Sequence, residues 1–236
     1  MTEIQFRSDM SVETTRVEGD DLDVARAAWV STKGQRAEDE ADRDRATGLI
    51  NMLMRDRHGS PFEQVGLQFL VSAPIFVWRE HMRHRIASYN EMSGRYTQLA
   101  PVFYEPAVDR ALVQQGKPGA YSFVAGTEEQ HGNAVFAIRH AARTAYGLYE
   151  VLLAQDVAKE VARMTLPVSI YSTAYVRMNL RALMNFLSLR TKSPNARFPS
   201  FPQREIEMVA EQYERAMEDH FPLVWSAFVL NGRVAP

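Results

Sequence analysis

The sequence contains no cysteine, and this absence removes several kinds of chemistry. Without cysteine the chain forms neither disulfides nor thiolate metal sites, and no reaction can begin with a thiolate nucleophile. Lysine is also scarce, so nearly all of the 27 basic residues are arginine. The flat guanidinium fork of arginine suits phosphates and carboxylates better than an ammonium group does.

Long apolar runs, charged tails and common nucleotide motifs are missing too. The opening stretch MTEIQFRSDM carries charges where a secretory signal needs an apolar run, and nowhere do eighteen apolar residues follow one another. We therefore expect a cytoplasmic protein without a membrane span. The net charge of -2 gives no reason to expect binding to nucleic acid polymers. Neither G-x-G-x-x-G nor G-x-x-x-x-G-K-[ST] occurs, so any nucleotide or flavin is bound by another route.

The apolar spacing predicts an α+β fold, with helices packed on a small sheet in a single domain over residues 1–236. Branched and aromatic residues predict strands at 12–17, 64–73 and 168–176. Spacing of three and four residues predicts helices at 21–30, 38–58, 74–85, 128–163, 181–189, 205–220 and 222–230. The stretch 100–126 is rich in proline and glycine, which favours an extended excursion or a loop.

A dense polar segment, HMRHRIASYNEMSGR, occupies residues 81–95 directly after an apolar helix. Successive helical residues are turned by about 100°. If the helix continues, Arg83, His84 and Arg85 therefore cannot share one solvated face. At least one of them is expected to point toward the core, a ligand or another subunit. A phosphate or carboxylate is a suitable partner, because a buried cation without one is costly.

Other interpretations of this segment are possible. It can be a solvated, charged helix end, or the phosphate-binding part of a nucleic-acid module, which would be colourless and bind polymers with a steep salt dependence. His81 and His84 are spaced for a metal, with Glu80 and Glu91 nearby, but the adjacent arginines repel a cation. We therefore expect no metal site. Ser93 has no base patterned for it and is expected to bind rather than to act as a nucleophile.

Residues 83–95, RHRIASYNEMSGR, resemble the signature R-H-R-x-x-S-x-N-E-x-S-x-R of the flavin-dependent thymidylate synthases at every fixed position. HGSPFE at 58–63, ARMTLP at 162–167 and MNLRALMNFLSLR at 178–190 resemble further segments of that family. The resemblance implies FAD-dependent reductive methylation of dUMP to dTMP, with methylenetetrahydrofolate as the carbon donor and NADPH as the reductant. The other thymidylate synthase family uses a thiolate, which this chain lacks.

The resemblance also assigns roles to individual residues. It places the flavin against Ser60, Glu63, Arg83, His84, Arg85, Glu91, Asn179, Leu180, Arg181 and Asn185. It places the nucleotide against Glu80, His81, Met82, Arg83, Glu91, Met92, Ser93, Gly94, Arg95, Arg163 and Arg190. Arg190 is expected to be catalytic, because its permanent charge beside N3 and a carbonyl would favour the ionised uracil. For Asn179 and Asn185, hydrogen bonding within a helix or loop is the alternative.

Three further expectations follow from the resemblance. The family builds its site from several chains of a homotetramer, so we expect the same here. The segment 191–204, hereafter the proline-rich segment, contains no histidine where relatives place one beside the flavin, so no flavin contact is assigned to it. A related methylase that acts on UMP or dUMP in a specialised nucleoside pathway would share these motifs, and the sequence does not identify what senses the ribose 2' position.

Overall fold

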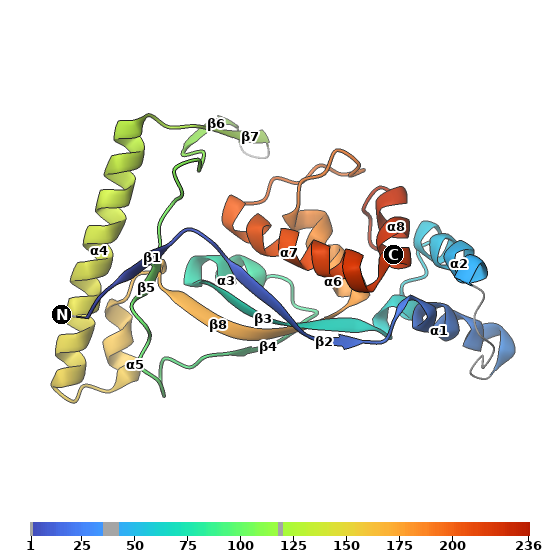
Figure 1. Ribbon diagram of the computed structural model, residues 1–236, viewed down its shortest axis with the longest axis horizontal. Coiled ribbons are helices and arrows are strands. Elements are labelled where there is room, and N and C mark those ends of the chain that lie inside the picture. The colour runs from blue at the N-terminus through green and yellow to red at the C-terminus, as the bar shows by residue number, and fades with distance from the viewer. Residues whose placement is uncertain (1, 35–42, 118–119) are drawn as a thin grey trace. The chain divides into compact units, whose positions relative to one another are not determined.

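The computed structural model describes residues 2–34, 43–117 and 120–236 (Figure 1). The chain forms two compact units by its internal contacts. Unit 1 comprises Met1–Ser11, Ser72–Met82 and Glu91–Ala174, and unit 2 comprises Val12–Val71, Arg83–Asn90 and Tyr175–Pro236. The chain therefore passes between the units several times, and each unit contains blocks that are far apart in the sequence.

A four-stranded sheet has the order β2-β3-β8-β4. Its strands are β2 (Ser11–Glu18), β3 (Gly66–Pro74), β8 (Tyr171–Asn179) and β4 (Ser88–Glu91). Each of them begins in one unit and ends in the other. Buried and less buried residues alternate along β3 and β8, as expected for strands with one better-covered face. This sheet and the helices confirm the predicted α+β class.

Unit 1 is built around the long helix α4 (Glu128–Ala154), drawn in yellow-green in Figure 1. Thr127 and Gln130 form a capping box, in which each side chain accepts the backbone N–H of the other, at 3.1 and 2.8 Å. Tyr149 of α4 and Phe103 are fully buried in one hydrophobic cluster. The other elements of unit 1 are β1 (Gln5–Arg7), paired in parallel with β5 (Val102–Tyr104), α3 (Ile75–His81), the antiparallel hairpin β6 (Val113–Lys117) with β7 (Ala120–Val124), and α5 (Lys159–Ala162).

In unit 2, α6 (Leu180–Arg190) and α7 (Arg204–His220) lie side by side (Figure 1). The fully buried ring of Tyr213 on α7 lies 4.2 Å from Phe69 of β3 and 5.4 Å from Phe186 of α6, measured between ring centroids. These aromatic contacts fix α6 and α7 against the strand, since buried rings contribute large apolar areas. The remaining helices of unit 2 are α1 (Asp21–Lys33), α2 (Arg43–Arg55) and α8 (Pro222–Leu230).

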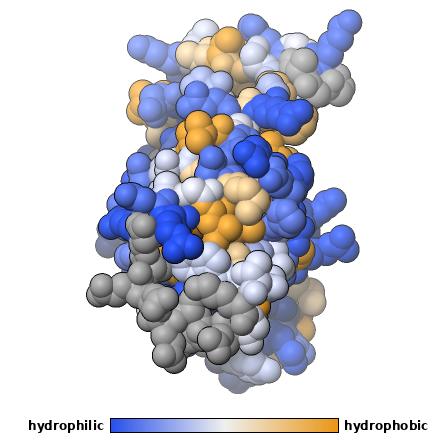
Figure 2. Space-filling view, turned by 90° about the vertical axis from the view of Figure 1, so that its right-hand side faces the viewer, coloured by the Kyte–Doolittle hydropathy of each residue, from blue (hydrophilic) through white to orange (hydrophobic). Residues whose placement is uncertain are grey.

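The helices α1, α2 and α8 pack on one another and form one end of unit 2. The buried carboxylate of Asp21 accepts the backbone N–H groups of Leu223 and Val224, both at 3.0 Å, and thereby caps the start of α8. Figure 2 views this side, where a small hydrophobic area lies among hydrophilic residues. Leu230 and Val30 are the most exposed large apolar residues of these helices, and such single exposures are normal.

Most predicted elements are confirmed, and the differences have local causes. The strand at 12–17 and the helices at 205–220 and 222–230 appear as β2, α7 and α8. The helix predicted at 128–163 is interrupted, because Asp156 adopts a left-handed φ of 58° between α4 and α5.

The stretch 100–126 is not a loop throughout, since it contains β5 and the β6–β7 hairpin. Of the helix predicted at 38–58, positions 38–42 lie outside the described residues, and α2 ends at Arg55. Among the described residues, no helix is long and apolar enough to cross a membrane.

Candidate active site

The signature segment begins where α3 ends, and its conformation differs from the predicted helix. The N–H of Met82 donates to the carbonyl of Trp78 at 2.9 Å, which closes the last turn. Strand β4 begins at Ser88, so the chain must become extended within a few residues. The prediction of a helix through Arg85 is therefore wrong. Residues 83–87 form a bent connection in which the side chains of Arg83 and Arg85 are exposed and His84 is half-buried.

His84 faces the last residue of α6. The Nε group of Arg190 donates a hydrogen bond to Nε2 of His84 at 3.1 Å. The imidazole packs on the ring of Phe186, with 4.5 Å between centroids, and the hydroxyl of Tyr89 donates to the backbone carbonyl of His84 at 2.9 Å. Burial, and then the charge of Arg190, lower the pKa of His84 to about 4, so the imidazole is neutral at physiological pH. The structure thus brings two predicted site residues into direct contact.

A second polar cluster surrounds the start of α6. Arg181 donates to the carboxylate of Glu63 at 2.6 Å and to the backbone oxygen of Pro236 at 2.7 Å. Gly59 lies directly against this guanidinium, and a Cβ at that position would come within 2.5 Å of Nε of Arg181. Glu63 and Ser60 belong to the short 3-10 turn Ser60–Glu63, and both side chains are exposed. The HGSPFE block and the α6 block therefore meet in unit 2.

The two predicted asparagines of α6 make hydrogen bonds within the helix. Oδ1 of Asn179 accepts the N–H of Ala182 at 2.8 Å and caps the helix start. Nδ2 of Asn185 donates to the carbonyl of Arg181 at 3.1 Å. Both asparagine side chains thus form the intrahelical hydrogen bonds that were the alternative to flavin contacts. The Leu180 side chain is fully buried.

Unit 1 holds the second half of the signature. The hydroxyl of Ser172 on β8 donates to the carboxylate of Glu91 at 2.6 Å, and the N–H of Met92 donates to the carbonyl of Thr173 at 2.9 Å. These bonds fix the start of the E-M-S-G turn to β8. The hydroxyl of Ser93 accepts the N–H of Arg95 at 3.3 Å, a hydrogen bond that is common for serine in turns.

Two predicted arginines flank the buried Gly94. Its position is crowded, because a Cβ would come within 3.2 Å of Leu99 and 3.3 Å of the Arg163 side chain. Arg95 pairs with Glu160 at 2.9 Å, and both side chains are about half exposed. The structure thus brings the signature and the A-R-x-x-L-P block together in unit 1. An exposed pair of this kind contributes little stability, so Arg95 can exchange Glu160 for a ligand at small cost.

The residues before the signature differ in exposure. His81 is 1% exposed and its ring lies 5.3 Å from that of Trp78, whereas Met82 is exposed and Glu80 is half-buried. No three His, Asp or Glu side chains gather as a metal cluster in the part of the chain that the structure describes.

Sequence reasoning missed the partners that hold these residues. Phe186, Tyr89, Ser172 and Glu160 each contact a predicted site residue. Tyr89 occupies a variable position of the signature, and Phe186 is an apolar residue of a helix. Glu160 had a detectable signal, because this acidic residue lies three positions before Arg163, next to the A-R-x-x-L-P block.

A model of the family described as thymidylate synthase complementing protein matches residues 12–223. A flavin-dependent thymidylate synthase from Streptomyces coelicolor is 55% identical over 236 residues, which cover 99% of this chain and 96% of the relative. The chain belongs to the flavin-dependent thymidylate synthase family. One from Tropheryma whipplei is 51% identical over 232 residues, covering 98% of this chain and 97% of the relative.

Solved structures of a UMP/dUMP methylase PolB from Streptomyces cacaoi are also similar. The form bound with 5-Br UMP has a TM-score of 0.91 at 47% identity, and each chain is covered to 99%. The form bound with 5-Br dUMP has a TM-score of 0.93 at 49% identity, with 99% of this chain and 100% of that chain covered. The signature and the three further blocks thus lie in an enzyme of the flavin-dependent thymidylate synthase family.

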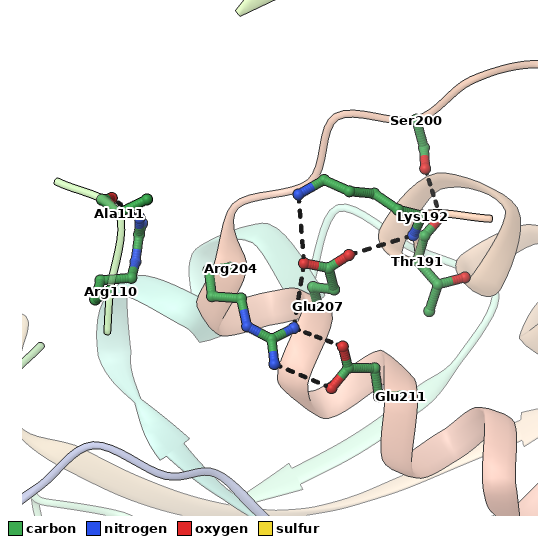
Figure 3. A network of polar contacts seen from close by, with 8 residues as sticks. All are labelled: Arg110, Ala111, Thr191, Lys192, Ser200, Arg204, Glu207 and Glu211. Atoms are coloured by element: carbon green, nitrogen blue, oxygen red, sulfur yellow. Dashed lines mark hydrogen bonds and ion pairs between the residues drawn. The ribbon is translucent and has the colours of Figure 1, made fainter. Parts of the chain in front are cut away.

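The proline-rich segment of this family member is held by polar contacts at both ends (Figure 3). The hydroxyl of Ser200 donates to the carbonyl of Thr191, and the N–H of Lys192 donates to the carboxylate of Glu207 at 3.3 Å. Arg204 donates to the same carboxylate at 3.2 Å. Glu207 is buried, so these donors compensate its desolvation. The residue that follows Arg190 is therefore part of a fixed network.

Proposed function

We propose that the enzyme methylates dUMP to dTMP, taking a methylene from methylenetetrahydrofolate and using FAD that NADPH reduces. The observation that carries the assignment is the Arg190–His84 pair, in which a permanently charged guanidinium is held beside the R-H-R signature by a neutral ring. Such a cation activates a uracil without any thiolate. The chain contains no cysteine and therefore no thiolate.

The polar cluster of unit 2 fits an FAD molecule. Arg83 and Arg85 are exposed, and guanidinium groups bind a pyrophosphate through paired N–H donors. Because Gly59 has no Cβ, the Arg181 guanidinium can lie directly against its backbone. In our proposal Ser60, Glu63, Arg181 and Asn185 hold one part of the FAD and the signature arginines another. Bound flavin supplies the hydride that completes the methyl group.

The polar residues around Gly94 in unit 1 suit a nucleoside monophosphate. Arg95 directly follows Gly94, the Arg163 side chain lies beside Gly94, and both cations are exposed, so in our proposal they bind the phosphate of dUMP. Glu91 is fixed by Ser172 and can accept a hydrogen bond from the sugar or the base. We propose that Glu80, Met82, Met92 and Ser93 complete this wall and that buried His81 supports it.

Arg190 activates the pyrimidine in this proposal. A guanidinium remains protonated, so it cannot remove the N3 proton, which passes to solvent; its charge stabilises the ring once N3 is ionised. The negative charge then spreads to C5, the carbon that accepts the methylene. Donors aimed at a developing charge are worth most where they are preorganised, and the bond to His84 provides that preorganisation.

The geometry of α6 supports a site shared between chains. Arg181 and Arg190 are nine positions apart, and about 100° per residue leaves them half a turn apart around the helix axis. Asn185 shares the face of Arg181, to which it is bonded. One α6 helix therefore directs the two sets to opposite sides. We propose a homotetramer in which Arg181 of one chain and Arg190 of another serve the same FAD and dUMP.

Exposed apolar side chains on α4 are suited to form a contact surface between the chains of such a tetramer. Phe136, Leu148 and Val151 are 71%, 54% and 52% exposed along this helix. Light scattering should give a species of about four chains, whereas a fully active monomer would refute the proposal.

A complementation test asks about the shared site directly. Arg181→Ala and Arg190→Lys chains, each inactive, should regain activity when unfolded and refolded together, in about one quarter of sites by random mixing. Each variant refolded alone is the matched control. Absence of recovery in mixed tetramers of confirmed composition would contradict a site shared through these two residues.

A second candidate substrate is UMP. The 47–49% identity to a UMP/dUMP methylase over nearly the whole chain favours this alternative, in which the enzyme serves a specialised nucleoside pathway. Methyl transfer to dUMP and to UMP should be compared at saturating folate and NADPH. A ratio of kcat/KM above about 100 in favour of dUMP would assign the enzyme to dTMP synthesis, since a site that senses one hydroxyl reaches such ratios.

Flavin content tests the whole assignment. The purified protein should be yellow, carry noncovalent FAD and be bleached by NADPH. A colourless protein that binds no added FAD but binds nucleic acid with a steep salt dependence would favour the nucleic-acid module instead. We further propose that both units function as one domain. We also propose a cytoplasmic location, where folate and nucleotides are available.

A further inference from the structure

We infer that His84 is a positioning residue for Arg190. Its ring accepts the Nε hydrogen of the guanidinium, and this turns the edge with the two Nη groups toward the pyrimidine. The inference rests on the proposed role of Arg190 and adds to it. The resemblance assigns His84 to the flavin, whereas the structure directs its Nε2 atom to an arginine.

The contact defines the chemical state of the ring. A guanidinium N–H can only donate, so Nε2 of His84 must carry no proton, and the single proton of the neutral ring is on Nδ1. A protonated His84 would lose this acceptor and place a second positive charge 3.1 Å from the first. Burial and the neighbouring charge keep the pKa of His84 at about 4, so the ring remains an acceptor at neutral pH.

The histidine itself is held on several sides. Its ring packs at 4.5 Å on Phe186, one turn before Arg190 on the same helix, and Phe186 packs on the buried Tyr213. The Tyr89 hydroxyl holds the backbone carbonyl of His84 at 2.9 Å. A ring with fixed neighbours can fix the arginine in turn, whereas a mobile surface histidine could not.

The backbone beyond Arg190 is fixed by separate contacts. The hydroxyl of the buried Thr191 donates to the carbonyl of Leu187 at 2.8 Å and accepts a hydrogen bond from Arg233. Arg233 is itself paired with Glu214 through two bonds of 2.9 Å. In Figure 3, Ser200 reaches the Thr191 carbonyl from the proline-rich segment. The main chain next to Arg190 is thus anchored separately from the guanidinium, and the bond to His84 acts on the orientation of the guanidinium itself.

Three variants separate positioning from general support. His84→Phe keeps a ring on Phe186 and removes the acceptor, whereas His84→Gln can place an amide oxygen near the position of Nε2. Ser188→Ala, which removes a hydroxyl bonded to the Asn185 carbonyl within α6, is the matched control. We expect His84→Phe to bind FAD normally, with kcat lowered by up to about 100-fold and little change in the KM for dUMP. His84→Gln should recover to within about 10-fold of wild type, and Ser188→Ala should be unchanged.

Two results would overturn the inference: wild-type turnover in His84→Phe, or equal loss of FAD from both His84 variants. A double-mutant cycle adds a quantitative check. Because lysine has no Nε–H donor at that position, His84→Phe should have almost no further effect on kcat in the Arg190→Lys background. Fully additive losses would mean that His84 acts independently of Arg190.

The tautomer of His84 can be measured in the wild-type protein without an activity assay. The ring nitrogens of the six histidines can be labelled with 15N, and the His84 signals identified by their loss in His84→Gln. The Nδ1–H tautomer between pH 5 and pH 8 supports the inference, and an Nε2–H or charged ring overturns it. If instead the wild-type enzyme fails to methylate any uracil nucleotide while His84 shows this tautomer, the proposed function fails and the contact stands.

Discussion

Replacing Arg190 by lysine separates the charge of this residue from its shape. Lysine keeps one positive charge on a similar stem but has a single ammonium group at its end. The substitution therefore removes the Nε donor that reaches His84 at 3.1 Å, together with the planar edge that we assign to the pyrimidine. Helix α6 should be unaffected, because Arg190 is its last residue and lysine is a good helix former.

The expected loss can be estimated from what the charge does. If Arg190 stabilises the ionised ring only in the transition state, its directed donors are worth about 100- to 1000-fold in kcat. That ratio corresponds to about 3 to 4 kcal/mol of transition-state stabilisation. FAD is held by the set around Arg181 on the other face of α6, so flavin occupancy should not change. The KM for dUMP should change much less than kcat.

The assay is methyl transfer to dUMP at saturating NADPH and folate, with FAD occupancy taken from the absorption spectrum. Arg177→Lys is a matched control, because Arg177 of β8 forms a partly exposed ion pair with Glu18 of β2, across β3, and lies outside the proposed site. Its turnover should equal that of wild type. A fully flavinated Arg190→Lys enzyme with near wild-type kcat would remove Arg190 from the catalytic role.

Three shorter predictions test other parts of the structure. Arg95→Lys should raise the KM for dUMP several-fold with little change in kcat, because an exposed cation binds the phosphate equally in ground and transition states. Asp21→Ala should lower the free energy of unfolding by about 2 kcal/mol, measured in urea, since two N–H groups at the start of α8 lose their acceptor. Because the pKa of His84 is lowered from 6.5 to about 4, the unfolded chain binds the extra proton between these values. Stability should therefore fall as the pH drops through this window, and less steeply in His84→Gln; equal slopes would contradict the neutral ring.

Helices and strands could be predicted where local pattern and local structure agree. The helix predicted at 222–230 has the bounds of α8, because a proline at its first turn and an apolar sequence determine it locally. The helix predicted at 74–85 runs four residues beyond the end of α3, since nothing near His81 breaks the helical pattern. What ends α3 is the pairing of β4 with β8, more than eighty positions away, and periodicity contains no information about that partner.

The same limit applies more strongly to the site. Motif resemblance identified both His84 and Arg190, yet it gave them separate roles, because a motif records residue types and not the atoms that meet. They lie 106 positions apart, and their contact depends on α6 packing against Tyr213 and on Thr191 anchoring the end of the helix. The neutral state of His84 exists only in that environment, since an exposed histidine beside two arginines would titrate near its ordinary pKa. Residue identity was therefore readable from the sequence, while the direction of the guanidinium, on which the proposed chemistry depends, is a property of the fold.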